Sequence, residues 1–392
     1  MEPWNDWVPG VLNKVQVKQL CEEGLITVES PIDSALDESS MDLSLASDAF
    51  RMVRGSVKPS AMRPYGWFLK KKELAEKQDP NADGVYTLRA RNTYVFKLRE
   101  RLERKLAGIG IHGQATAKST VGRVDVLVRL IVDGMDTYEC FDPTGLATQS
   151  GDMYLEITPI TFSVAVKQGT RLSQLRLFYG HPKSAEMSGE QLINTIFHGS
   201  DKRDGSLTVS LENTIIGGLR TAAFCAKSSE SQSVIPLWVG ERKPEPQMHW
   251  RFSESDPTNR LEIQAENFYI LRSKETISVP KGIAIYCRAS DETIGEMRIH
   301  YAGFVHPLFG LRRKDGKKGT PLIFEVRGHQ VNVSLADGER MANLTFYRMS
   351  QDAIGDSDPT EYEDQTLQLS KLFDKWPEKL KRISADGTVE AV

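Results

Sequence analysis

The sequence repeats one pattern of residues at a long, constant interval, and this repeat constrains the fold more than any other feature. Three positions recur with an offset of 169 residues (325 − 156 = 169): Glu156 and Glu325, Gly169 and Gly338, Leu175 and Leu344. The stretch from Asn92 to Phe96 recurs from Asn267 to Leu271 with a slightly longer offset of 175 residues (267 − 92 = 175). The period is far longer than the units of solenoid proteins. The sequence therefore predicts a tandem duplication of one domain.

Each copy is rich in short strands that are separated by Gly, Pro and Asp. Strand length and spacing favour an antiparallel barrel or sandwich over a βαβ sheet. The segments expected as strands are 40–45, 124–132, 153–157, 162–166, 283–287, 297–301 and 322–326. Helices are expected at 13–23, where Asn13 can cap the first turn, at 189–197, and in the tail at 367–382. The predicted fold class is mainly β with a few helices, in two tandem barrel domains.

The chain is long enough for two domains that each bury a core. Its 392 residues divide into halves of nearly 200 residues each. The stretch from Ser200 to Asn259 contains two Pro-containing polar motifs and is the expected junction. We predict a boundary near Ser206, with domains at 1–205 and 206–392.

Composition excludes several classes of partner. The net charge is −3, which gives no electrostatic footprint for nucleic acid. No stretch approaches the ~20 apolar residues of a membrane span, and the first residues lack the features of a signal peptide. The four cysteines are scattered, with no paired spacing. A reduced, cytoplasmic protein is expected.

The familiar enzyme motifs are absent. Zinc-dependent deaminases need His-x-Glu together with Pro-Cys-x-x-Cys, and neither motif occurs in the sequence. The seven histidines never have the helical spacing of metal ligands. The phosphate-loop and nucleophile-elbow motifs are absent as well. We expect no protein-held metal.

One polar turn has the composition of an anion site. Lys118-Ser119-Thr120-Val121-Gly122-Arg123 can direct backbone N–H groups, a hydroxyl and a guanidinium at one anion. Its copy, from Asp291 to Glu296, carries acidic residues that would repel a phosphate. The two copies therefore suggest that the first turn binds an anion and the second does not. The alternative is that the first turn is an ordinary surface turn.

Glu156 and Glu325 form the second candidate pair. Each follows apolar or aromatic residues inside an expected strand, where glutamate is disfavoured. A glutamate partly buried beside a ligand can have a pKa raised toward neutrality and can shuttle protons. The alternative is an outward-facing residue on a half-solvated sheet.

These residues resemble the deoxycytidine triphosphate (dCTP) deaminase branch of the deoxyuridine triphosphatase superfamily, in its double-length bacterial form. The turn from Lys118 to Arg123 resembles the family's Ser-x-x-x-Arg turn, and Tyr154-Leu-Glu156 resembles the segment with its catalytic glutamate. Leu172 to Leu175 resembles the next strand. The stretch from His300 to Gly310, with Ala302, resembles a sugar-contacting hairpin, and Glu361 to Phe373 resembles a C-terminal lid. His306 and Glu361 depart from the usual Asp and Lys.

The resemblance implies zinc-independent, hydrolytic deamination of dCTP to dUTP and ammonia, within pyrimidine deoxynucleotide metabolism. A glutamate would take a proton from water, Ser119 would steady the intermediate, and Arg123 would neutralise phosphate charge. Magnesium (Mg²⁺) would be bound through the triphosphate. The implied catalytic residues are Glu156, Ser119, Arg123 and Glu325. The implied nucleotide-binding residues are Lys118, Thr120, Gly122, Asp142 (as a sugar-contacting acid), Tyr154, Gln174, Ala302, His306, Tyr362 and Gln365.

Several alternatives stay open at this point. A dUTP pyrophosphatase, a bifunctional deaminase–triphosphatase and a non-catalytic nucleotide-binding module are the other functions considered. Glu156 is ranked first as proton shuttle, meeting Ser119 and Arg123 of a neighbouring chain, and Glu325 is ranked second. Family sites lie between barrels of a threefold assembly, so a homotrimer of six barrels in two stacked rings is expected. The tail from Tyr362 to Ser370 is expected to close over bound nucleotide, or else to form a permanently packed terminal helix.

Overall fold

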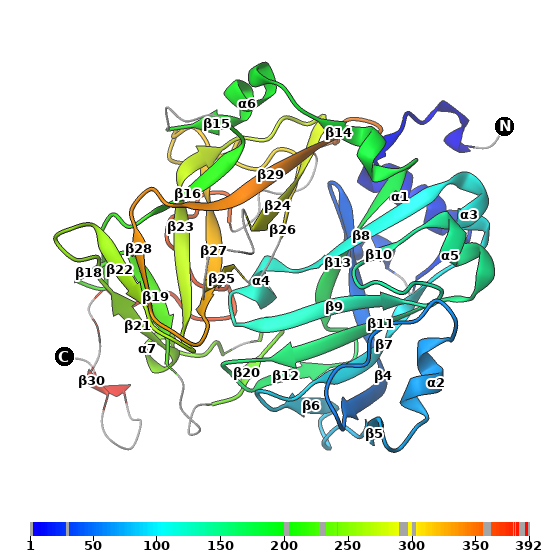
Figure 1. Cartoon of the computed structure of the whole chain (residues 1–392), viewed down its shortest axis with the longest axis horizontal. Coiled ribbons are helices and arrows are strands. Elements are labelled where there is room, and N and C mark those ends of the chain that lie inside the picture. Colours follow the sequence, from blue (N-terminus) through cyan, green and yellow to red (C-terminus); the bar gives the residue numbers. More distant parts are fainter. Residues whose placement is uncertain are drawn as a thin grey trace.

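The chain forms two barrel-like β-sheet halves that lie side by side (Figure 1). The computed structural model describes residues 3–28, 31–199, 204–227, 233–240, 242–289, 297–299, 303–355, 362–378, 380, 382–383 and 389–390. Each half is built around an 11-stranded antiparallel sheet. The predicted fold class, mainly β with two tandem domains, is confirmed.

The first half contains thirteen strands and five α-helices among the described residues. Its strands are β1 (Gly10–Val11), β2 (Ile26–Thr27), β3 (Leu36–Asp37), β4 (Ser40–Met52), β5 (Ala75–Gln78), β6 (Val85–Leu88), β7 (Tyr94–Leu102), β8 (Ile111–Ala117), β9 (Val126–Val132), β10 (Cys140–Phe141), β11 (Gly151–Pro159), β12 (Val164–Lys167) and β13 (Arg171–Tyr179). Its helices are α1 (Lys14–Glu22), α2 (Tyr65–Leu69), α3 (Lys105–Ile109), α4 (Ser119–Gly122) and α5 (Pro143–Thr148).

The second half repeats this arrangement. Its strands are β14 (Glu186–Met187), β15 (Phe197–His198), β16 (Ser206–Ser210), β17 (Thr214–Ile216), β18 (Leu219–Thr221), β19 (Ala223–Ala226), β20 (Ile235–Pro236), β21 (Trp250–Ser253), β22 (Arg260–Ile263), β23 (Phe268–Ile277), β24 (Ile283–Ala289), β25 (Met297–Ile299), β26 (Gly303–Val305), β27 (Thr320–Gly328), β28 (Val333–Ala336), β29 (Arg340–Arg348), β30 (Arg382–Ile383) and β31 (Val389–Glu390). Its helices are α6 (Glu190–Ile196) and α7 (Pro246–His249).

The strand pairing reproduces the sequence repeat. β11, β12 and β13 begin 169 residues before β27, β28 and β29 (320 − 151 = 169). β12 pairs with β6 in the first half, and β28 pairs with β22 in the second. β14 and β15 already pair with strands of the second sheet. The boundary near Ser206 stays a prediction.

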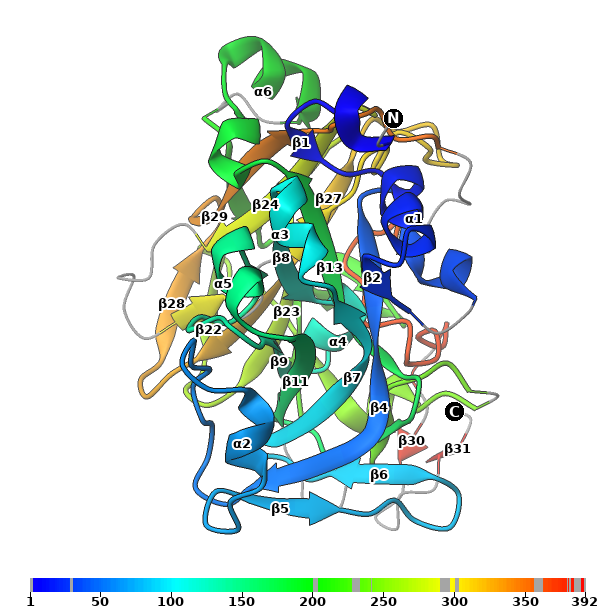
Figure 2. The ribbon, with the colours of Figure 1, turned by 90° about the vertical axis from the view of Figure 1, so that its right-hand side faces the viewer.

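Local sequence explains the N-terminal helix. The Asn13 side chain accepts hydrogen bonds from the backbone of Val15 (3.1 Å) and Gln16 (3.0 Å), and Gln16 bonds back to Asn13, which completes a capping box. The helices predicted at 13–23 and 189–197 are confirmed as α1 and α6. α2, α3 and α5 lie on the side of the first half that faces away from the second (Figure 2), whereas α1 contacts the second half, where Gln16 Nε2 donates to Ser350 Oγ at 2.9 Å.

The helix predicted at 367–382 is wrong within the described residues of that segment, because this tail is irregular from residue 362 to residue 378. Leu367 and Leu369 are both buried, although they are only two residues apart. Two side chains at that spacing reach one surface from an extended chain, whereas a helix turns them apart. The tail from residue 362 to residue 378 therefore packs on the protein as an extended segment.

The two halves share a continuous apolar core at their interface. Phe224, Trp250 and Phe268 of the second half pack into the hydrophobic cluster of the first half. β20 also adds to the first half, since Ile235 pairs in parallel with Val164 of β12. The tail side chains Leu367, Leu369, Leu372 and Phe373 fill the same cluster. This interface fixes how the two halves face each other.

Candidate active site

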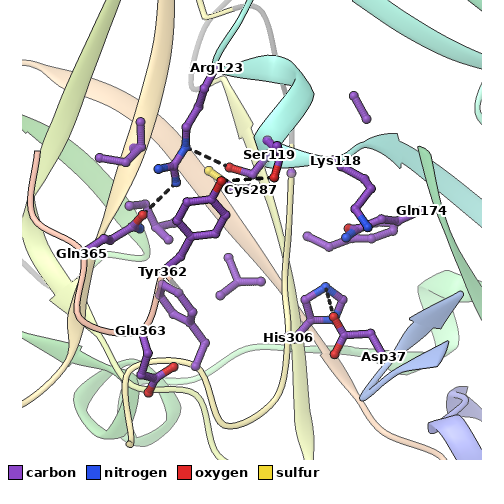
Figure 3. A pocket seen from close by; sticks show the side chains of 18 of the residues that line it. Asp37, Lys118, Ser119, Arg123, Gln174, Cys287, His306, Tyr362, Glu363 and Gln365 are labelled. Carbon is purple, nitrogen blue, oxygen red and sulfur yellow. Dashed lines mark hydrogen bonds and ion pairs between the residues drawn. The ribbon is translucent and has the colours of Figure 1, made fainter. Parts of the chain in front are cut away.

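A cavity of about 350 Å³ lies between the two halves and is covered in part by the tail (Figure 3). The first half contributes the turn around α4 and Gln174 of β13. The second half contributes parts of β24, β26 and β27 together with the loop after β26. Elements far apart in sequence therefore meet at one place.

The α4 turn presents Ser119 and Arg123 to this cavity. α4 is a single turn, closed by hydrogen bonds from the Val121 and Arg123 backbone to Lys118 (2.8 Å) and Ser119 (3.1 Å). This geometry puts Ser119 and Arg123 on one side of the turn, and Arg123 Nε donates to Ser119 Oγ at 3.2 Å. Arg123 is only 2% exposed, and burial lowers the pKa of its guanidinium. Lys118, beside it, forms an ion pair with Asp42.

Glu325 of β27 faces the same cavity from the second half. Its side chain is buried, and burial raises the pKa of its carboxyl to about 8, although the nearby Arg123 guanidinium opposes the rise. Cys287 of β24 lines the cavity as well, and burial, with Glu325 adding to it, raises the pKa of this thiol to about 12. A carboxyl group that titrates near neutral pH can both take and give a proton there.

The raised pKa of Glu325 makes the stability of the protein depend on pH. The folded state holds this proton up to about pH 8, whereas an unfolded glutamate loses it near pH 4.5. The stability from the neutral carboxyl is therefore complete below pH 4.5 and is lost as the pH rises through 8. The neutral variant Glu325→Gln should gain unfolding free energy over the unmodified protein by roughly 1.4 kcal/mol per pH unit across this window. Thermal unfolding of both proteins at several pH values measures this gain, and a pH-independent difference would contradict it.

Glu156, the repeat counterpart of Glu325, lies outside the cavity. Its carboxylate is 1% exposed and is held in an ion pair by Arg129, whose Nε donates at 3.0 Å. Tyr138 Oη donates to the other carboxylate oxygen at 3.2 Å. Tyr65 of α2 packs on the adjoining Tyr154 and belongs to the cluster that covers this face. The first half thus covers its own glutamate with its own side chains.

The tail closes the cavity through Tyr362 and Gln365. The Tyr362 ring stacks on the Arg123 guanidinium at 4.1 Å, and its hydroxyl is hydrogen-bonded to Thr120 Oγ1 at 3.1 Å. Gln365 Oε1 accepts from Arg123 at 2.7 Å, while Gln365 Nε2 donates to the Pro321 carbonyl at 2.8 Å. Ser370 Oγ donates to the Thr120 carbonyl at 2.7 Å. These contacts dock the tail on the α4 turn.

Comparison with known proteins identifies the family. A family model described as the 2'-deoxycytidine 5'-triphosphate deaminase N-terminal domain matches residues 8–181, and the model of its C-terminal domain matches residues 187–373. The chain belongs to the dCTP deaminase family. The crystal structure of 2'-deoxycytidine 5'-triphosphate deaminase from Agrobacterium tumefaciens is similar, with a TM-score of 0.77 and 26% sequence identity. The match covers 88% of this chain and 97% of that chain. A comparison with curated proteins found no significant match.

Membership in the dCTP deaminase family, together with the similar deaminase structure, supports deamination of dCTP as the activity. In the described part of the chain, every helix is too short or too polar to span a bilayer.

The structure brings most of the predicted dCTP-binding residues together. Those that line the cavity are Lys118, Ser119, Thr120, Arg123, Gln174, His306, Glu325, Tyr362 and Gln365. Gly122 is buried within α4. Ala302, and the lid position Glu361, lie outside the described residues.

Three predicted residues lie elsewhere. Asp142 is exposed and caps α5, where it accepts from the Gly145 backbone at 2.8 Å. Tyr154 is buried against Tyr65 on the outer face of the first sheet. Glu156 is paired with Arg129 of its own half, whereas Glu325 faces Arg123 within one chain. The ranking of the two glutamates as proton shuttle stays a prediction.

Sequence reasoning missed several residues that line the cavity. These are Asp37, Glu38, Cys287, Arg288, Phe304, Glu363 and Lys371. Glu363 and Lys371 belong to the tail. Its apolar residues Leu367, Leu369, Leu372 and Phe373 could have indicated that this segment packs against the rest of the protein. Asp37 ends β3 and Glu38 follows it in a turn, neither belongs to a motif, and only the tertiary fold brings them to the cavity.

Proposed function

We propose that the protein deaminates dCTP to dUTP and ammonia in the cavity between its two halves. The observation that carries the proposal is that Glu325, with a pKa near neutrality, shares this cavity with Ser119 and Arg123. Family membership supplies the substrate class. The role of proton shuttle is assigned to Glu325, and Glu156 is assigned a structural role.

The proposed reaction is hydrolytic. The ionised Glu325 carboxylate takes a proton from water as the water oxygen bonds to C4 of cytosine, and it delivers that proton to the ring nitrogen N3. The same carboxylate then carries the remaining hydroxyl proton to the amino group, the C4–N bond breaks, and ammonia leaves. A group with a pKa near the operating pH suits both transfers. The Ser119 hydroxyl stabilises the charge that develops on the oxygen bonded to C4.

The cations of the cavity suit the triphosphate. Lys118, Arg123, Arg288 and Lys371 line the space around the α4 turn. Arg123 is already held on two sides by Ser119 and Gln365, so binding a phosphate costs it little side-chain entropy. Mg²⁺ arrives with the nucleotide as part of the substrate and needs no protein cage.

We expect deamination to be independent of zinc. The sequence lacks the His-x-Glu and Pro-Cys-x-x-Cys motifs that hold zinc and its catalytic glutamate in the other class of deaminase. Treatment with a zinc-selective chelator should leave the rate of ammonia release unchanged, measured with Mg²⁺ held constant. Stoichiometric zinc in the purified protein, lost together with activity, would contradict this expectation.

Product analysis tests the proposed function against its alternatives. Incubation with dCTP should release ammonia and dUTP in equal amounts, without pyrophosphate. Release of pyrophosphate together with ammonia would indicate a bifunctional deaminase–triphosphatase, and pyrophosphate from dUTP alone would indicate a pyrophosphatase. Binding of dCTP without any product would indicate a non-catalytic module. A homotrimer stays a prediction that light scattering can test, and the proposed site draws both of its sides from one chain.

A further inference from the structure

A buried ion pair joins the two halves beside the proposed active site. Arg327 of β27 donates through Nη2 to Asp125 Oδ2, and both side chains are buried. Thr161, in the loop between β11 and β12, donates to the same Asp125 oxygen at 2.6 Å, and its own oxygen accepts from Arg327. Arg327 Nη1 donates to the Glu266 carbonyl, just before β23. The ion pair therefore contacts both halves at once.

Each partner lies two residues from a residue of the proposed catalytic machinery. Asp125 follows Arg123 at the end of the α4 turn, where the Asp125 backbone N–H donates to the Gly122 carbonyl at 2.9 Å. Arg327 follows Glu325 on β27, and side chains two residues apart in a strand lie on one face. The Asp125–Arg327 contact therefore joins the α4 turn to the face of β27 that carries Glu325.

Stability alone does not explain this ion pair. Removing two charged groups from water is costly, and apolar residues of similar volume often stabilise a core equally well or better. A buried ion pair instead favours one arrangement, because a charge that loses its partner inside the protein is strongly disfavoured. Asp125 also has a left-handed backbone (φ 56°), so its place in the turn is constrained. The contact thus determines where β27 lies against α4.

The position of β27 against α4 matters for the proposed reaction because the reacting groups belong to different halves. Ser119 and Arg123 belong to the α4 turn, whereas Glu325 is on β27. A displacement of about 1 Å between such groups can lower a rate on the order of 100-fold. We infer that Asp125 and Arg327 are positioning residues, which hold Glu325 against the α4 turn for proton transfer. This inference rests on the proposed function.

The ionisation of Glu325 reports its position relative to α4. Arg123 lowers the pKa of Glu325 and so opposes the effect of burial. Cys287 of β24, which is also coupled to Glu325, stays neutral because its pKa is about 12. If β27 moves away from α4, Arg123 stabilises the carboxylate less, and the pKa of Glu325 rises. The proposed reaction needs the ionised carboxylate, so the pH at which kcat rises should then be higher.

The test replaces the ion pair by two uncharged residues, in the double variant Asp125→Asn with Arg327→Met. This variant leaves no lone charge in the core, and Asn tolerates the left-handed backbone at this position. We expect a folded protein whose kcat for dCTP is about 10- to 100-fold lower. KM should change by less than about threefold, because the cations of the α4 turn are kept. The pH at which kcat rises should increase by roughly one unit.

Two further variants separate positioning from stability. Arg327→Lys keeps the charge but loses the forked geometry of the guanidinium, so its kcat should lie between those of the double variant and the unmodified protein. Glu266→Gln is the matched control, because it neutralises an exposed ion pair that also crosses between the halves, from Arg91 at 3.9 Å. Exposed ion pairs contribute little, so this control should keep both kcat and its pH profile. Thermal unfolding checks that each variant is folded.

The inference is overturned if the double variant is folded and keeps the kcat and pH profile of the unmodified protein. A lower kcat with an unchanged pH profile overturns it as well, because that result reflects stability alone. If the double variant does not fold, Arg327→Lys is judged by the same two criteria.

The titration of Glu325 can also be measured without turnover. It is the pH dependence of the difference in stability between a protein and its Glu325→Gln variant. Absence of ammonia release from dCTP by the unmodified protein would refute the proposed function. An upward shift of this titration in the double variant would still support the positioning of Glu325 by the ion pair, and an unshifted titration would refute it.

Discussion

Glu325→Gln is expected to lower the rate of dCTP deamination by roughly 10²-fold or more, the usual effect of removing an acid–base group. The substitution keeps the size of the side chain but removes the carboxylate that faces Arg123. Steady-state assays of ammonia release measure the loss. Calorimetric binding of dCTP to the variant, expected to change little, separates a loss of chemistry from a loss of binding.

Glu156→Gln is the matched variant and should keep most of the activity. The substitution should lower the free energy of unfolding, because it leaves the Arg129 guanidinium facing a neutral amide at a buried site. Arg129 is 29% exposed, so solvent screens part of the effect, and we expect a loss of roughly 1–3 kcal/mol. Thermal or denaturant unfolding measures it. A Glu156→Gln protein without activity, beside an active Glu325→Gln protein, would reverse both assignments.

Truncation after Gly355 is expected to prevent the chain from folding. The deleted segment contains Leu367, Leu369, Leu372 and Phe373, which are 3–5% exposed within the apolar core that the two halves share. Removing one large core side chain typically costs about 2–5 kcal/mol. The loss of all four is comparable with the roughly 5–15 kcal/mol that stabilises a typical domain. Circular dichroism and solubility of the truncated protein check the outcome.

A second truncation provides the control for this experiment. A stop after Glu378 removes only the last residues and keeps all four apolar anchors, so the protein should remain folded. The single variant Phe373→Ala should lose about 3–5 kcal/mol of unfolding free energy. The protein cut after Gly355 could instead stay folded and show only a higher KM. In that case the tail closes over bound nucleotide, and the interpretation of the tail as a permanent part of the core is wrong.

The repeat was visible in the sequence because it preserves both the spacing and the type of residue. Both glutamates could be found in the same way, and the α4 turn could be found by its composition. Which glutamate lies beside the α4 turn could not be predicted, because this depends on how the two halves pack against each other. Arg129 lies 27 residues before Glu156 on a neighbouring strand, and only the strand register brings the two together. Without that register, the sequence places the α4 turn and Glu156 of the same repeat in one predicted site.

The contacts of His306 could not be predicted from the sequence, for a similar reason. Asp37 and Ser39 contact His306 across sequence separations of more than two hundred residues, and neither belongs to a motif. The helix expected at 367–382 is absent from the described residues of the tail, which follow the surface they pack against. Their buried positions follow the partner surface, which the sequence does not describe.

The tail also has a consequence for the order of events during synthesis. Ser370 bonds to Thr120, a partner that left the ribosome 250 residues earlier. At about 5–20 residues per second, the first half waits roughly 10–50 s for the segment that completes the core it shares with the second half. The nascent N-terminal half therefore exposes part of its apolar surface, and the tail covers that surface only near chain release. A ribosome-bound chain stalled before residue 355 should accordingly remain sensitive to protease, whereas the released chain should not.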